Sequence, residues 1–146
     1  MADEPINPLV KLVEERLPWL LLEHGFRILD YRYDSKSFGN CLVLLESPAL
    51  RLRFIRDRGI TTAELAARTD PETWYDAGLL LSFLNGGRPD PAFEGLAVLL
   101  KQNWKELDEA LGTKLSETKE WEMRRREETK KFLESYQREF NQKLRR

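Results

Sequence analysis

The sequence predicts an α+β fold in a single domain over residues 1–146, and three observations support this prediction. Apolar residues recur with the helical period before residue 25, with a period of two from 26 to about 67, and with the helical period again afterwards. The links within the period-two region are too short for a crossover helix, which favours antiparallel strands. The chain has 146 residues, of which 41% are hydrophobic, and this suits one buried core.

The first element is predicted to be a helix that is kinked or split. Asn7 is a good N-cap, and Pro8 follows at the first helical position, where its missing N–H does no harm. Gly25 ends the helical pattern. Pro18 lies inside it, removes a backbone donor and clashes one turn back, so it should kink the helix or divide it in two. The apolar positions at helical spacing are Leu9, Leu12, Val13, Leu17 and Leu20.

Three or four strands should follow as an antiparallel meander. Residues 50–54 alternate apolar and basic side chains, as a half-buried strand does, and residues 41–45 are apolar on both faces. Residues 26–33 form an earlier strand. Residues 60–67 are either a fourth strand or a helix, because residues 63–67 also favour helix. In the first strand we expect Leu29, Tyr31 and Tyr33 to point inward.

Three helices should complete the chain. A capping box formed by Thr69 and Glu72 predicts a helix that starts at 69–72 and ends at 85–87. Asp90 and Pro91 predict the start of a second helix, which runs unbroken to Gly112. The last helix should begin near residue 116 and cover roughly 43 Å at 1.5 Å per residue. The residues expected in or near the core are Trp19, Phe54, Trp74, Leu100 and Trp104.

The last helix differs in charge from the rest of the chain. Residues 114–146 hold 11 Lys and Arg against 7 Asp and Glu, a net charge of +4, which leaves −5 for residues 1–113. Its distal apolar stripe needs a surface to cover it. The helix therefore either folds back along the first helix, or projects and pairs with another copy. The candidate oligomerisation residues are Leu133, Tyr136, Phe140 and Leu144.

Several classes of function are disfavoured by composition. Uncharged runs are far shorter than the roughly 20 residues that span a bilayer, so no membrane span is expected. His24 and Cys41 are the only residues of their types, so no metal site of the usual ligands is expected. His24 suits a helix C-terminus, and Cys41 suits the core. One cysteine also fits a cytoplasmic protein.

No phosphate-binding or dinucleotide-binding glycine motif is present, so we expect no cofactor and no enzyme.

The outer face of the sheet should carry mixed charge. Arg51 and Arg53 project from one strand, Asp30 and Arg32 from another, and Glu64 from a third. Interleaved acids weaken the positive stripe that nucleic acid needs, whereas protein interfaces favour Arg and Tyr.

Phe38 stands in a polar loop with two possible roles. It either folds back to cap the core or forms a recognition tip.

Part of the chain resembles a known family. Residues 34–40, 42–47 and 50–59, with Asp70-Pro71 and Trp74-Tyr75-Asp76, are similar to small bacterial immunity proteins of polymorphic toxin systems. The resemblance covers roughly residues 5–85 and leaves out the last helix. It implies a small α+β domain that blocks a cognate toxin by binding it.

The resulting hypothesis is a non-catalytic bacterial protein-binding module, in its most specific form an immunity-type inhibitor. The alternative is a structural homo-oligomer assembled through the last helix. No nucleic acid, membrane or metal is expected among the partners. The candidate residues for binding a partner protein are Tyr33, Lys36, Phe38, Arg51, Arg53 and Arg56.

Overall fold

A computed structural model describes residues 6–85 and 93–144, and it has the predicted α+β class. The strands are β1 (Arg27–Asp34), β2 (Asn40–Glu46), β3 (Leu50–Asp57), β4 (Ile60–Ala67) and β5 (Tyr75–Asp76). The helices are α1 (Pro8–Arg16), α2 (Pro18–Glu23), α3 (Ala77–Asn85), α4 (Phe93–Gln102), α5 (Trp104–Leu111) and α6 (Leu115–Leu144).

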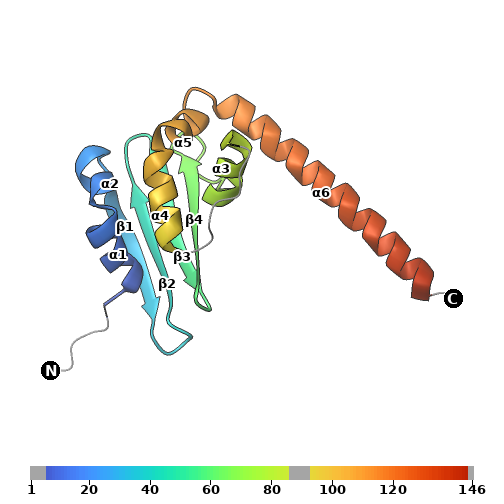
Figure 1. Cartoon of the computed structure of the whole chain (residues 1–146), viewed down its shortest axis with the longest axis horizontal. Coiled ribbons are helices and arrows are strands. Elements are labelled where there is room, and N and C mark those ends of the chain that lie inside the picture. Colours follow the sequence, from blue (N-terminus) through green and yellow to red (C-terminus); the bar gives the residue numbers. More distant parts are fainter. Residues whose placement is uncertain (1–5, 86–92, 145–146) are drawn as a thin grey trace.

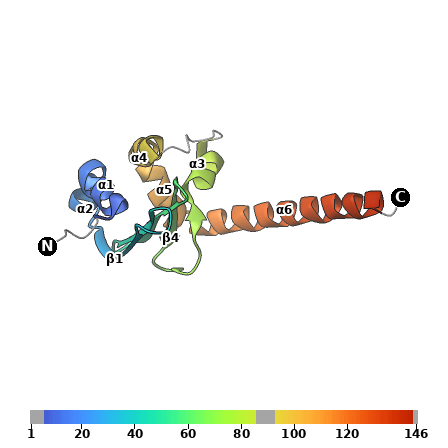
Figure 2. The same cartoon turned by 90° about the horizontal axis from the view of Figure 1, so that it is seen from below.

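The five strands form one antiparallel sheet in the order of the chain (Figure 1). Figure 2 shows α1 to α5 on one side of this sheet. On the other side, which we call the outer face, the described part of the chain places a loop but no helix. The long helix α6 leaves the body and extends away from it.

Asn7 joins the first helix to the sheet. Its side-chain oxygen accepts from the amides of Leu9 (2.9 Å) and Val10 (3.3 Å), as predicted for an N-cap. Its Nδ2 donates to the carbonyl oxygens of Arg32 (2.9 Å) and Leu42 (3.2 Å) in β1 and β2. The residue is buried, so one amide group satisfies both a helix end and two strands.

Pro18 divides the N-terminal helix in two, which is one of the two predicted outcomes. It stands at the first position of α2, where a proline lacks no needed donor. The C-cap of α2 is His24, and Gly25 follows in the left-handed region with φ of +69°, as its predicted role as a stop requires.

Alternate residues of β2 and β3 form the centre of the core. Val43 and Leu45 are fully buried opposite Phe54 and Leu52, against the helices. Cys41 is also buried, as predicted. The core further contains Trp19, Leu100 and Trp104, as the sequence indicated.

The expectation that Leu29 points inward is wrong. A β-bulge between Ile28 and Asp30 shifts the register by one residue. Ile28 pairs with Leu45 and packs against the core, while Leu29 is exposed. After the bulge, Tyr31 and Tyr33 lie on the helix side, opposite Val43 and Cys41, although Tyr31 at this sheet edge remains largely exposed.

Residues 60–67 form a strand and not the alternative helix, because they pair along their whole length with β3. The helix predicted to start at 69–72 is wrong. Tyr75 pairs with Leu65, so the chain adds the short strand β5 before α3 begins at Ala77. Asp76 caps α3 in place of Thr69, since its carboxylate accepts from the amide of Leu79 at 2.9 Å.

The single helix expected to end at Gly112 is also wrong, because Asn103 separates α4 from α5. The Asn103 side chain donates to the carbonyl oxygen of Leu99 at 2.9 Å, and such local bonds compete with helix geometry. Gly112 is the C-cap of α5, as predicted. The predicted start at Asp90 and Pro91 lies outside the described residues.

The substitution Asn7→Ala should lower the free energy of unfolding by about 2 to 3 kcal/mol, because it removes a helix cap and leaves two strand carbonyls without their donor. Urea unfolding measured by fluorescence checks this. Asn141→Ala is the matched control, since Asn141 is exposed on α6, and it should change stability by less than about 0.5 kcal/mol. Equal effects of the two substitutions would contradict the role of Asn7.

Candidate binding surfaces

Two hairpin turns lie side by side at one end of the sheet, at the lower edge of Figure 1. We call this region, with residues 34–40 and 56–60, the hairpin end. The amide of Arg58 donates to Oδ1 of Asn40 at 2.9 Å, which joins the two turns. The Asp34 carboxylate accepts from the amides of Lys36 and Ser37, both at 3.1 Å. The turns are therefore held by their own hydrogen bonds, as Asx-type turns are.

Phe38 is the one aromatic residue of the hairpin end. Its side chain is 79% exposed, so the expectation that it folds back to cap the core is wrong. Its φ is +59°, in the left-handed region that bulky residues rarely adopt. Such backbone strain is concentrated at functional sites. The backbone at Phe38 is strained, and the ring is nevertheless exposed to solvent. This combination favours the interpretation of Phe38 as a recognition tip.

A shallow groove of about 420 Å³ lies beside these turns. Leu42 and Ile55 contribute its apolar lining, and both belong to the outer face because they alternate with the buried residues of β2 and β3. Charges of both signs surround them, from Arg32, Arg56, Asp34 and Asp57. The groove thus combines an apolar centre with a charged border of no net sign.

The structure places three of the six predicted partner-binding residues, Lys36, Phe38 and Arg56, at the hairpin end, and a fourth, Tyr33, directly before it. Tyr33 and Arg56 line the groove from the helix side of the sheet, because both lie opposite Cys41 in the strand pairing. The outward position of Leu42 and Ile55 was not predicted from the sequence. The run of apolar residues in β2 conceals which of them face outward, and only the pairing register with β3 separates them.

The other two predicted residues, Arg51 and Arg53, lie farther along the outer face and hold the loop after β4. Trp74 is not a core residue, contrary to prediction, because it lies on this face with both guanidinium groups over its ring, at 5.1 and 4.1 Å. Arg53 also pairs with Glu64 at 3.0 Å. The predicted mixed-charge face with cross-strand pairs is therefore present.

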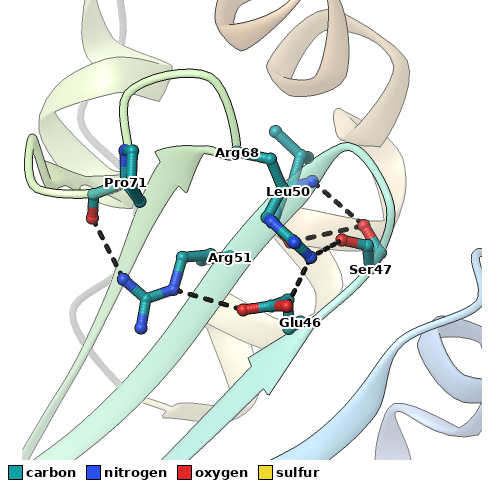
Figure 3. A network of polar contacts seen from close by, with 6 residues as sticks. All are labelled: Glu46, Ser47, Leu50, Arg51, Arg68 and Pro71. Carbon is teal, nitrogen blue, oxygen red and sulfur yellow. Dashed lines mark hydrogen bonds and ion pairs between the residues drawn. The ribbon is translucent and has the colours of Figure 1, made fainter.

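A polar network continues this attachment (Figure 3). Arg51 donates to the carbonyl oxygen of Pro71 at 3.1 Å and lies 3.6 Å from the Glu46 carboxylate. Arg68 pairs with the same carboxylate and donates to the carbonyl oxygen of Ser47 at 3.0 Å. These contacts give Arg51 a structural role within the chain. A residue that binds another protein needs an available guanidinium group, and the group of Arg51 is already engaged.

Comparisons of this chain with protein-family models, with curated proteins and with solved structures find no match. Among the helices that the structure describes, none is both long enough and apolar enough to cross a membrane. Within the same residues, no three His, Cys, Asp or Glu side chains are grouped so that they could hold a metal ion.

The first turns of α6 are fixed to the body. Thr118 is buried, and its hydroxyl donates to the carbonyl oxygen of Ala110 at 2.8 Å. Trp121 stacks on Phe83 with ring centroids 4.5 Å apart. Lys119 pairs with Asp70 at 3.2 Å. Hydrogen bonds, stacking and charge therefore set the direction in which α6 leaves the body.

Glu122 is the buried carboxylate at this attachment. Arg125 donates to it at 2.8 and 3.0 Å, and Arg126 donates at 3.0 Å. These hydrogen bonds, with Arg125 as the larger cause, lower the pKa of Glu122 below its ordinary value of 4.5. Burial and the nearby carboxylates of Asp70 and Glu122 raise the pKa of Tyr75. Burial likewise raises the pKa of the Cys41 thiol, which is therefore a poor nucleophile.

The distal part of α6 is not packed against the body, as Figure 2 shows. Of the two predicted outcomes, folding back along the first helix is wrong, because the apolar residues of this part are 51% to 69% exposed. The exposed apolar stripe consists of Phe132, Leu133, Tyr136, Phe140 and Leu144. Four of these five are the predicted oligomerisation residues.

The substitution Glu122→Gln should lower the free energy of unfolding at pH 7 by about 1 kcal/mol, because it removes charge-assisted hydrogen bonds. The folded pKa of Glu122 is lowered, so its contribution is complete above pH 4.5 and is lost as the pH falls through the folded pKa. Wild type and variant should therefore converge in stability at low pH, in urea unfolding followed by tryptophan fluorescence. Glu120→Gln, at an exposed position of α6, is the control. A constant difference between pH 7 and pH 3 would contradict this.

Proposed function

We propose that this chain is a non-catalytic protein-binding module that contacts its partner through the hairpin end. The observation that carries the proposal is Phe38, an aromatic side chain that is 79% exposed on a strained backbone. A groove with the apolar residues Leu42 and Ile55 lies directly beside its turn. An exposed aromatic anchor next to an apolar hollow is the combination that concentrates binding energy at protein interfaces.

The charges at the hairpin end favour a protein over a nucleic acid. Arg32 and Arg56 alternate with Asp34 and Asp57 around the groove, so no positive stripe follows it. Phosphate backbones require such a stripe, whereas protein interfaces have mixed polar rims around an apolar centre. Tyr33 and Arg56 add two of the residue types that are enriched in those interfaces.

An immunity-type inhibitor in the bacterial cytoplasm is the most specific form of this proposal. It is supported by the resemblance of residues 5–85 to immunity proteins of polymorphic toxin systems. The hairpin end belongs to the segments that carry that resemblance, and α6 does not. Inhibition would be steric: the hairpin end would cover the cognate toxin's surface, and no residue of this chain would take part in chemistry.

A structural homo-oligomer is the second candidate function. It is favoured by a different observation, the uncovered apolar stripe on distal α6. The two functions use surfaces at opposite ends of the molecule and can be tested separately.

The substitution Phe38→Asp should reduce partner binding at least 30-fold, because truncating an interface anchor costs about 2 kcal/mol or more. The tagged protein is purified from its native host, and co-purifying proteins are quantified by mass spectrometry. Affinity for the recovered partner is then measured with both purified proteins. Arg56→Ala should weaken binding by a smaller factor.

Leu22→Asp is the matched control, since Leu22 is 84% exposed on α2, away from the hairpin end. It should leave affinity unchanged. The inhibitor proposal further expects that the recovered partner is toxic when expressed alone, and that wild type but not Phe38→Asp protects the cell. Equal affinity of wild type, Phe38→Asp and Arg56→Ala would rule out the hairpin end as the binding surface.

A further inference from the structure

The exposed stripe of α6 continues the face by which the same helix is attached to the body. Thr118 and Glu122 are the two buried residues of α6. Tyr136 and Phe140 follow them by 18 residues each, which is five complete turns at 3.6 residues per turn. They therefore point in the same direction from the helix axis, about 27 Å farther along it. The body covers the first part of this face and leaves the second part open.

The stripe has the composition of a buried helix face. Three of its five residues are aromatic, and all five are more than half exposed. Isolated apolar side chains are normal on a surface, but a contiguous row along four helical turns marks an interaction site. The opposite side of the helix is charged, with Glu127, Glu134 and Arg138 all exposed.

We propose that this stripe packs against the same stripe of a second copy, with the two α6 helices antiparallel. The proposal deepens the second candidate function, since it assigns the partner and the direction of the contact, and it does not depend on the hairpin end. Around a two-fold axis, Tyr136 of each copy lies opposite Phe140 of the other. Such a contact is self-complementary and closes as a dimer.

The position of the body determines the direction. The body and the stripe lie on the same side of α6. The N-terminal half of a parallel partner helix would therefore occupy the same volume as the body of the first copy. An antiparallel partner that overlaps only residues 132–144 extends past the free end of α6 and meets no body. The overlap is then about 18 Å long, and the two bodies lie at the far ends of the dimer.

The size of the stripe determines the expected strength. With about 100 Å² from each half-exposed side chain, five residues from each copy bury about 1,000 Å² in total. This is near the lower limit of about 1,000 to 1,200 Å² for a specific interface. We therefore expect a reversible dimer that forms at micromolar concentrations, not a permanent one.

Sedimentation velocity of the full chain between about 1 and 200 µM tests the proposal. Wild type should shift from monomer to dimer over this range, and Tyr136→Glu and Phe140→Glu should remain monomeric at every concentration. Arg138→Glu introduces charge on the opposite side of the same turns and should dimerise like wild type. All substituted side chains are exposed, so far-UV circular dichroism should be unchanged.

The direction is tested with spin labels on single introduced cysteines, because the native Cys41 is buried. An antiparallel pair centred near residue 138 separates labels at Glu127→Cys by about 33 Å along the axis and labels at Arg138→Cys by almost no axial distance. Both positions lie on the side away from the partner, so the width of the helix pair adds to both distances, and the distance at residue 127 should be clearly the longer of the two. Equal distances at the two positions would overturn the antiparallel arrangement.

A wild type that stays monomeric up to 200 µM, or a Phe140→Glu variant that still dimerises, would overturn the pairing of stripes. Recovery of a different protein bound to this stripe would also overturn it, because the occupant would then not be a second copy. Phe38→Asp is carried through the same experiment and should dimerise normally. Loss of partner binding and loss of dimerisation are thereby separated, so each proposal can fail alone.

Discussion

Among the described residues, helices cover only one face of the sheet, and the properties of the other surfaces follow from that constraint. Val43, Leu45, Leu52 and Phe54 are fully buried beneath the helices, which demands that their neighbours in β2 and β3 face the opposite way. The outer face therefore carries apolar side chains that the helices do not cover. Its covering comes instead from the loop between β4 and β5, held by Trp74 over two arginines. The hairpin end lies beyond this loop, and the described residues leave it uncovered.

The same constraint explains why arginines on one strand have different roles. Arg51 and Arg53 lie where the loop crosses the sheet, and their charges are neutralised by Glu46 and Glu64. The attraction within a partly buried ion pair exceeds the cost of desolvation only when the geometry is good. The ring of Trp74 adds a cation–π contact to both arginines. Arg56 lies near the turn, on the opposite face of β3 because it pairs with the buried Cys41, and it lines the groove. Strand face and position along the strand, and not residue type, decide which arginine holds the loop and which lines a surface that can bind a partner.

Local signals in the sequence predicted the elements whose formation depends on local chemistry. The cap at Asn7, the division at Pro18 and the length of α6 follow from residues close in the sequence. The errors arose where distant residues decide the outcome. The capping box at Thr69 is a sound local signal, but pairing of Tyr75 with Leu65 extends the chain before a helix can begin. The alternation of β3 indicated which face Arg51 occupies, but not which loop would cover it.

The two proposed surfaces are compatible within one assembly because they lie in different parts of the chain. Helix α6 starts after α5, at the end of the body away from the two hairpin turns (Figure 1). In an antiparallel pair of α6 helices the bodies lie at opposite ends, so both hairpin ends remain accessible. A weak dimer would thus present two identical binding surfaces. If the partner protein is itself multimeric, binding of one hairpin end makes binding of the other intramolecular. The apparent affinity of the dimer for that partner then exceeds the affinity of a single hairpin end.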